Sequence, residues 1–162
     1  MKSLPVSHCE NKKPWHIASG FTLLELLMVL AISAVMLLMS APLVFQFYQN
    51  QLVTDASKQL QDTLTIARTY SVANLGDTPH GVRIFPASST YVLFQGETYA
   101  TRLTSEDQTY PVSPSVTVTA TSTEVVFSQL YGTSTVDGVW SVFAGTFSRN
   151  IRIYSSGNIE ME

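Results

Sequence analysis

Gly20-Phe21-Thr22-Leu23-Leu24-Glu25 opens an apolar run that continues to Phe47 and decides the fold of this 162-residue chain. The 27 residues from Phe21 to Phe47 exceed the roughly 20 that cross a bilayer core. Between Lys13 and Asp55 there is no Lys, Arg or Asp, and Glu25 is the only Glu. A carboxylate in such a segment is costly, so it indicates a function and needs a partner. The run therefore predicts a membrane helix with one functional acid.

Charges on the two sides of the run predict its orientation. Three lysines precede it (Lys2, Lys12, Lys13), whereas the first Lys or Arg after it is Lys58. The positive-inside rule then leaves the leader in the cytoplasm and exports the C-terminal body. An ordinary cleaved signal peptide is the alternative, but its apolar region spans only about 7 to 15 residues. The run here is longer, and Ser40-Ala41-Pro42 is not a good Ala-x-Ala site, so we expect an anchored helix.

The composition argues against several classes of protein. Residues 21–162 carry six basic and eleven acidic side chains, a net charge of −5, which does not attract nucleic-acid backbones. The one cysteine, Cys9, lies in the leader, so the body has no disulfide or cysteine metal site. His80 is the only histidine after the leader, and only Asp77 lies near it. We therefore expect no catalytic residues, cofactor or metal site.

The apolar run continues into a longer predicted helix. No glycine occurs from Phe21 through Leu75, and Pro42 is the only proline, which predicts one helix of about 55 residues, or about 80 Å. Asn74-Leu75-Gly76 marks its end. Its outer half is amphipathic, because small and apolar residues recur at spacings of three and four: Val53, Ala56, Leu60, Leu64, Ala67 and Ser71.

After Gly76 the pattern changes to the alternation typical of strands. Predicted strands are Gly81–Phe85, Tyr91–Phe94, Thr98–Leu103, Ser115–Ala120, Glu124–Ser128, Val139–Phe143, Asn150–Tyr154 and Asn158–Met161. Val116 and Val118 favour a solvated strand within a loop-bearing region, Thr101–Thr123. Asp137-Gly138 is a hairpin-turn signal, and Trp140 is expected in the core. The prediction is an α+β fold, in which the long helix packs on an antiparallel β body.

The opening motif resembles the class III signal of type IV pilins and pseudopilins, because the basic leader, the Gly-Phe-Thr-Leu-Leu-Glu sequence and the apolar helix occur together in that order. The resemblance implies that prepilin peptidase cuts after Gly20 and that Phe21 becomes the N-methylated first residue. It also assigns assembly roles to Glu25, as the acid that pairs with a neighbouring subunit, and to Pro42, which loosens the helix.

Other residues resemble one branch of this family, the GspH/FimT-type minor pseudopilins and minor pilins. They are the helix end Leu60–Val72, with its Ala-Arg-x-x-Ser-Val sequence, the Gly-Val-Arg-Ile strand that follows, and the hairpin at residues 150–159. Many major pilins carry a C-terminal disulfide that this chain cannot form. The acids nearest the end (Asp137, Glu160, Glu162) do not suggest a calcium loop. Residues 96–148 match no pattern.

The resemblance implies a structural subunit, not an enzyme, of a type II secretion or type IV pilus-like filament. Its implied parts are a cleaved leader (1–20), a transmembrane half-helix (21–47), an amphipathic half-helix (48–75) and an exported β-rich body (76–162). Implied partners are prepilin peptidase, other pilin subunits and the inner-membrane assembly platform, with the helix anchored in the inner membrane. Two alternatives stay open: DNA uptake through Arg149 and Arg152, and adhesion through residues 96–148 with Tyr99, Tyr110 or Tyr131 exposed.

Overall fold

The computed structural model describes residues 20–162, and for residues 40–43 it describes the backbone alone. The predicted leader, apart from Gly20, lies outside the described residues. A long helix, α1 (Leu23–Val72), is followed by strands β1 (His80–Phe85), β2 (Thr90–Gln95), β3 (Gln108–Pro111), β4 (Thr117–Ala120), β5 (Glu124–Phe127), β6 (Gly138–Ala144), β7 (Phe147–Ile153) and β8 (Ile159–Met161).

The helix α1 is continuous over 50 residues, as its sequence predicts. At its start the Thr22 hydroxyl accepts a hydrogen bond from the Glu25 backbone N–H (3.2 Å), which caps the first turn. After its end, Asn74 (φ 55°) and Gly76 (φ 67°) take the left-handed conformation, which explains the Asn-Leu-Gly sequence there. The described residues divide into two compact units between residues 41 and 42, so α1 contributes to both.

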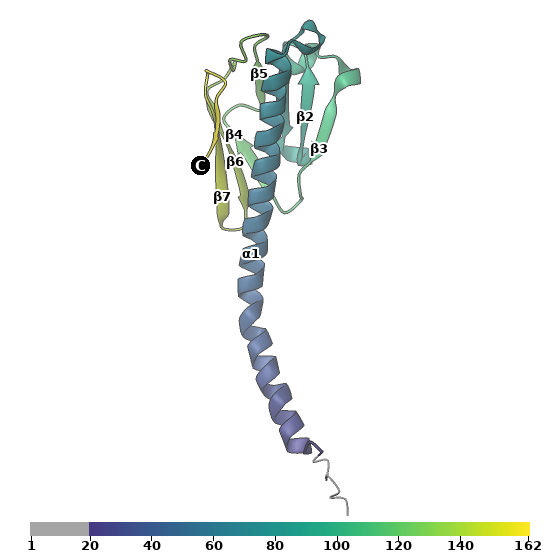
Figure 1. Ribbon diagram of the computed structural model, residues 1–162, viewed down its shortest axis with the longest axis vertical. Coiled ribbons are helices and arrows are strands. Elements are labelled where there is room, and N and C mark those ends of the chain that lie inside the picture. Colours follow the sequence, from purple (N-terminus) through teal and green to yellow (C-terminus); the bar gives the residue numbers. More distant parts are fainter. Residues whose placement is uncertain (1–19) are drawn as a thin grey trace, which may run out of the picture. The chain divides into compact units, whose positions relative to one another are not determined.

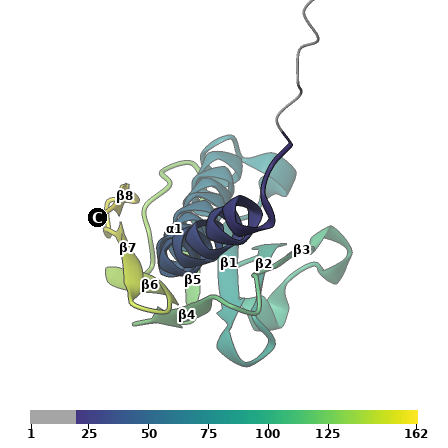
Figure 2. The same ribbon diagram turned by 90° about the horizontal axis from the view of Figure 1, so that it is seen from below.

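In the second unit the strands form two four-stranded antiparallel sheets. The first has the order β3-β2-β1-β5 and the second the order β4-β6-β7-β8. Figure 1 shows the strands flanking the outer part of α1, and Figure 2 shows them forming an arc along one side of it. This arrangement confirms the predicted α+β fold.

One hydrophobic core joins the helix to both sheets. The predicted apolar stripe of α1 supplies Val53, Leu60, Leu64 and Ala67, each at most 1% exposed. The inner faces of the sheets supply their partners, among them Val82, Tyr91, Phe127, Trp140, Val142, Ile151 and Ile153. Burying each large side chain of this set contributes about 1.5–3 kcal/mol. The position of the helix on the sheets therefore depends on this stripe.

The predicted strand at Thr98–Leu103 is wrong. The segment forms a 3₁₀ turn, Tyr99–Thr101, and a second such turn follows at Thr104–Glu106. The Thr98 hydroxyl accepts the Thr101 backbone N–H (3.3 Å), a local bond that competes with strand pairing. The third strand of the first sheet is β3 instead, which pairs with β2 through Tyr110 opposite Tyr91.

Two further local predictions need correction. Val116 (2% exposed) and Val118 (9% exposed) are buried in the core, so β4 is not solvated on that face. Asp137-Gly138 is not a hairpin turn, because the preceding strand β5 belongs to the other sheet and Gly138 is already the first residue of β6, where it pairs with Ile153 of β7. Trp140 lies in the core as predicted, 1% exposed, and its indole N–H donates to the Ser122 carbonyl (2.8 Å).

Candidate assembly site

The predicted site residues Gly20, Phe21 and Glu25 lie together at the start of α1. Phe21 is 81% exposed and precedes the helix, and the Leu26 backbone N–H donates to the Thr22 carbonyl (3.1 Å) in its first turn. Glu25 is exposed in that turn, where the positive end of the helix dipole favours an acid. A carboxylate and an amine at position 21 would therefore lie at the same end of one helix.

The helix that carries this acid presents apolar side chains on all sides. From Leu23 to Met39 every large apolar side chain is more than half exposed. Among the described residues α1 is the one helix long and apolar enough to cross a membrane. Such a surface is not stable in water, so it needs lipid or other apolar helices around it.

Pro42 lies within α1, and the helix continues through it. A proline has no N–H, so the hydrogen bond to the carbonyl four residues earlier is missing there. The boundary between the two compact units also falls at this residue. The assembly role expected for Pro42 stays a prediction.

At its other end α1 is joined to the β body through Ser71. The buried Ser71 hydroxyl donates to the Ala67 carbonyl (3.0 Å) and accepts the His80 backbone N–H (2.8 Å). Its own carbonyl accepts N–H groups from Asn74 (3.1 Å) and Leu130 (3.0 Å). One residue thus connects the helix end to the first strand and to the loop after β5.

Arg68 connects the same helix end to the C-terminal hairpin. Its Nε donates to the Gly132 carbonyl (3.2 Å). Gly157 adopts φ +82°, and a Cβ there would lie 1.8 Å from the same carbonyl oxygen, so only glycine fits. The Ala-Arg-x-x-Ser sequence and the hairpin glycine, far apart in the chain, therefore meet at one junction.

His80 is buried at this junction. It is 4% exposed and contacts the Tyr70 ring edge-to-face, with centroids 5.5 Å apart. Burial lowers the pKa of its imidazole, and a hydrogen bond to the Thr78 backbone raises it by less. Among residues 20–162 no group of three or more His, Cys, Asp or Glu side chains could hold a metal ion.

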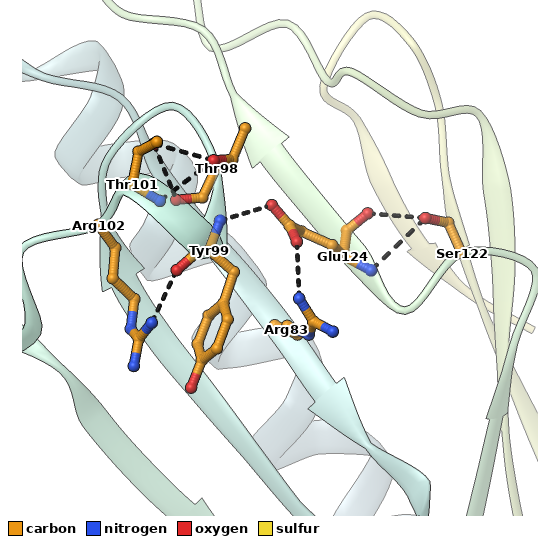
Figure 3. Close-up of polar contacts among 7 residues, drawn as sticks. All are labelled: Arg83, Thr98, Tyr99, Thr101, Arg102, Ser122 and Glu124. Atoms are coloured by element: carbon orange, nitrogen blue, oxygen red, sulfur yellow. Dashed lines mark hydrogen bonds and ion pairs between the residues drawn. The ribbon is translucent and has the colours of Figure 1, made fainter.

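The unmatched segment after β2 covers the outer face of the first sheet, as Figure 3 shows. The Tyr99 ring contacts two guanidinium groups, Arg102 at 3.6 Å and Arg83 at 4.8 Å from its centroid. Glu124 accepts hydrogen bonds from Arg83 (3.4 Å) and from the Tyr99 backbone N–H (2.8 Å). Arg102 pairs with Asp107 at 2.7 Å. Because each of these arginines has an acidic partner, the cluster holds the segment in place and does not form an anion site.

The tyrosines expected in an adhesive patch do not gather on the surface. Tyr99 is half-buried in the cluster just described, and Tyr110 stacks on Tyr91 with centroids 5.2 Å apart. Only Tyr131 of the three is exposed, at 80%.

The two arginines expected in a DNA site lie on opposite faces of β7. Arg149 shares the inward face with the buried Ile151, whereas Arg152 is exposed over the Tyr154 ring at 5.2 Å.

Sequence reasoning missed the Arg83–Tyr99–Arg102 cluster, because its members come from two elements and a loop. It also missed the junction formed by Arg68, Gly132 and Gly157.

Comparison with known proteins adds two findings. Residues 15–41 match the model of the prokaryotic N-terminal methylation motif. The structure is similar to that of the minor pseudopilin EpsH from the type 2 secretion system of Vibrio cholerae, with a TM-score of 0.53. The similarity covers 68% of this chain and 95% of that chain at 10% sequence identity, and at this identity it concerns the fold. No curated protein matches the chain significantly.

Proposed function

We propose that this chain is a minor pseudopilin or minor pilin, that is, a structural subunit and not an enzyme of the type IV pilin and pseudopilin family. In this proposal it is a structural subunit of a type II secretion or type IV pilus-like filament. The single observation that carries the proposal is the N-terminal methylation motif at the head of a long exposed apolar helix.

Prepilin peptidase is the first proposed partner. It removes residues 1–20 on the cytoplasmic side of the inner membrane and methylates the amine of Phe21. Support comes from the exposure of Gly20 and Phe21, which precede the first helical residue, so the scissile bond lies outside the helix. Mass spectrometry of the membrane-extracted chain should find an N-terminal N-methylphenylalanine. An N-terminus at residue 1, or at a signal-peptidase site near Ala41, would contradict the proposal.

Other filament subunits are the second partner, and Glu25 pairs with their N-terminal amines. An unpaired charge in an apolar helix bundle costs several kcal/mol, whereas a paired one costs much less. Only those axial positions that place an amine of one subunit beside the carboxylate of the next are therefore favourable. Glu25 therefore determines the axial position of neighbouring subunits relative to one another, and it affects the stability of the single chain less.

Membership of the secretion branch rests on the body. The fold resembles that of a minor pseudopilin of a secretion system, and the helix end and terminal hairpin resemble in sequence those of GspH/FimT-type proteins. The exported body packs on the C-terminal half of α1. The inner-membrane assembly platform is the third proposed partner, which adds the subunit to the filament.

The Glu25→Ala variant tests this function in the full-length chain. It should be processed and inserted in the membrane like the wild type but be lost from sheared filaments. The matched control is Asp62→Ala, which removes an exposed acid farther along the same helix and should assemble normally. Normal incorporation of the Glu25→Ala chain would disprove the pairing role.

A further inference from the structure

A polar cavity of about 120 Å³ lies where the end of α1 meets the first sheet. Tyr70 of α1 and Leu75, just after the helix, line one part of it, and residues of β1, β2, β3 and the turn before β3 line the rest. A protein cavity that holds benzene measures about 150 Å³. This cavity therefore has room for a group of a few heavy atoms.

The register of the first sheet brings four of the lining residues together. His80 of β1 lies opposite Gln95 of β2, and Leu93 of β2 lies opposite Gln108 of β3. Residues two apart on a strand share a face, and so do residues directly opposite each other on neighbouring strands. One wall of the cavity therefore carries an imidazole and two amides beside an apolar side chain.

The Gln95 amide is held so that its oxygen is free. Its nitrogen donates to the Thr78 hydroxyl (2.8 Å) and to the Gly76 carbonyl (3.4 Å). A Cβ at Gly76 would lie 2.0 Å from this nitrogen, so the glycine makes room for the amide. Because the nitrogen faces both acceptors, the oxygen is the end left for another molecule, and no residue of the described chain donates to it.

His80 supplies a second acceptor. It is 4% exposed, and its Nδ1 is buried without a side-chain partner. Burial lowers the pKa of the imidazole, so near pH 7 the ring is neutral and one of its nitrogens accepts hydrogen bonds. Buried polar groups normally have a partner, which favours a ligand that brings an N–H or O–H donor.

Glu106 gives the cavity its charge. It is the one charged residue in the lining, and its side chain is exposed. Among residues 20–162 its carboxylate has no ion pair or hydrogen bond, whereas the next acid, Asp107, pairs with Arg102 at 2.7 Å. The lining therefore carries one unpaired negative charge and no cation.

We infer that this cavity, here called the ammonium cavity, binds a primary alkylammonium group, either of a free amine or at the end of a lysine side chain of another polypeptide. An ammonium group has three N–H donors and no acceptor. The cavity offers it the Glu106 carboxylate, the Gln95 amide oxygen and the imidazole of His80 as acceptors. The inference goes beyond the filament function and does not depend on it.

The lining also selects against other small ligands. The unpaired charge of Glu106 repels an anion. A metal ion finds too few ligands, because the described residues contain no group of three or more His, Cys, Asp or Glu side chains that could hold one. The Tyr70 ring and Leu93 offer apolar surface to an alkyl chain, and an aromatic face also attracts a cation.

Calorimetric titration of the full-length chain in nonionic detergent tests the inference. The probes are n-butylamine and Nα-acetyl-lysine N-methylamide, and the neutral comparison is Nα-acetyl-norleucine N-methylamide, which has no ammonium group. We expect both amines to bind and the norleucine compound not to bind. Absence of binding by both amines, or equal binding of the norleucine compound, would overturn the inference.

A lysine derivative with a trimethylated Nε separates hydrogen bonding from charge. It keeps the positive charge but has no N–H donor, so we expect its affinity to be at least tenfold lower than that of the unmodified derivative. Equal affinities would show that the cavity selects charge alone, against the inference.

Glu106→Gln tests the location of the site. It removes the charge at an exposed position, so the chain should still fold, and it should weaken binding of both amines at least tenfold. The matched control is Glu97→Gln, which removes an exposed acid outside the cavity lining and should weaken binding less than twofold. Equal affinities of the two variants would place the amine elsewhere.

NMR of the histidine-labelled full-length chain supplies a direct readout at the cavity. Addition of either amine should shift the His80 signals in the wild type, and a tenfold higher concentration should be needed in Glu106→Gln. A shift caused by Zn²⁺ and by neither amine would overturn the inference in favour of a metal ion.

The two amines also distinguish the source of the ammonium group. If the lysine derivative binds at least tenfold more tightly than n-butylamine, the cavity recognises a lysine of another polypeptide, and if n-butylamine binds as tightly, it recognises a free amine. None of these measurements involves a filament, so their outcome is independent of the test with Glu25→Ala.

Discussion

At the scale of single residues, Ser71 and His80 show how one side chain can hold the two halves of the body together. Ser71 is fully buried, and its hydroxyl is both a donor to the helix and the acceptor for the first strand. His80 occupies the next layer, buried beside Tyr70. Both residues help to determine where the helix ends and the sheet begins.

Replacing Ser71 by alanine should destabilise the body by about 1–3 kcal/mol, because the His80 backbone N–H then lacks its buried acceptor. Chemical denaturation of the full-length chain in detergent measures the change. The control is Thr69→Ala, which removes an exposed hydroxyl bonded only within its own helix and should change the free energy of unfolding by less than about 0.5 kcal/mol. Equal effects of the two substitutions would contradict the role given to Ser71.

His80 should make the stability depend on pH. Burial holds the pKa of its imidazole in the folded chain below the ordinary value of 6.5. Below that pH the unfolded chain takes up a proton more readily than the folded chain, so the free energy of unfolding falls. Above it both states are neutral at this residue, and no contribution is expected. Unfolding measured between pH 7.5 and 5.5 should show this loss, and His80→Gln should reduce it.

At the scale of elements, the segment from Gly96 to Asp107 packs over the outer face of the first sheet and covers it. Its central residue Tyr99 contacts Phe94 and Phe85 edge-to-face, with centroids 5.5 Å and 5.3 Å away, and two arginines. A small second hydrophobic cluster forms there with Val92 and Val126.

Tyr99→Ala should loosen this cover while leaving α1 and the second sheet intact. The ring contributes buried area and two cation–π contacts, so we expect a loss of about 1–3 kcal/mol of local stability. Hydrogen exchange should increase in residues 96–107 first. The control, Tyr131→Ala, removes an exposed ring and should leave exchange in that segment unchanged, and a uniform increase across the body would contradict a local role.

At the scale of the whole molecule, the second unit depends on one junction of helix end, loop and hairpin. Arg68, Gly132 and Gly157 meet there, and the packing leaves no space for a side chain on the hairpin glycine. The two sheets are thereby fixed to the same helix end.

Gly157→Ala should therefore cost more than a typical turn substitution. The added Cβ would collide with the Gly132 carbonyl, and φ +82° is unfavourable for alanine, so we expect a loss of about 2–4 kcal/mol. Gly138→Ala is the control, because a Cβ there meets nothing closer than 3.5 Å and its φ is not positive. Thermal unfolding should separate the two variants, and similar melting temperatures would show that the junction tolerates rearrangement.

The local signals in the sequence were sufficient to predict the position of the helix and of most strands. The absence of glycine and the Asn-Leu-Gly stop placed α1 within a few residues of its observed ends. Alternation placed seven of the eight strands, because a buried inner face requires it. The predicted strand at Thr98–Leu103 is wrong because Thr98 forms a local turn that periodicity does not reveal, and the eighth strand, β3, was not predicted.

What the sequence by itself determined is the apolar helix with its Gly-Phe-Thr-Leu-Leu-Glu start, the amphipathic stripe and the α+β class. These depend on neighbouring residues and on the cost of charge in an apolar run. Only the tertiary structure decided the junction of Arg68 with Gly132, 64 positions apart, the cover around Tyr99 and the exposure of Leu130 and Tyr131 beside the helix end. Those features depend on contacts between distant segments, which exist only once the core has brought the helix and both sheets together.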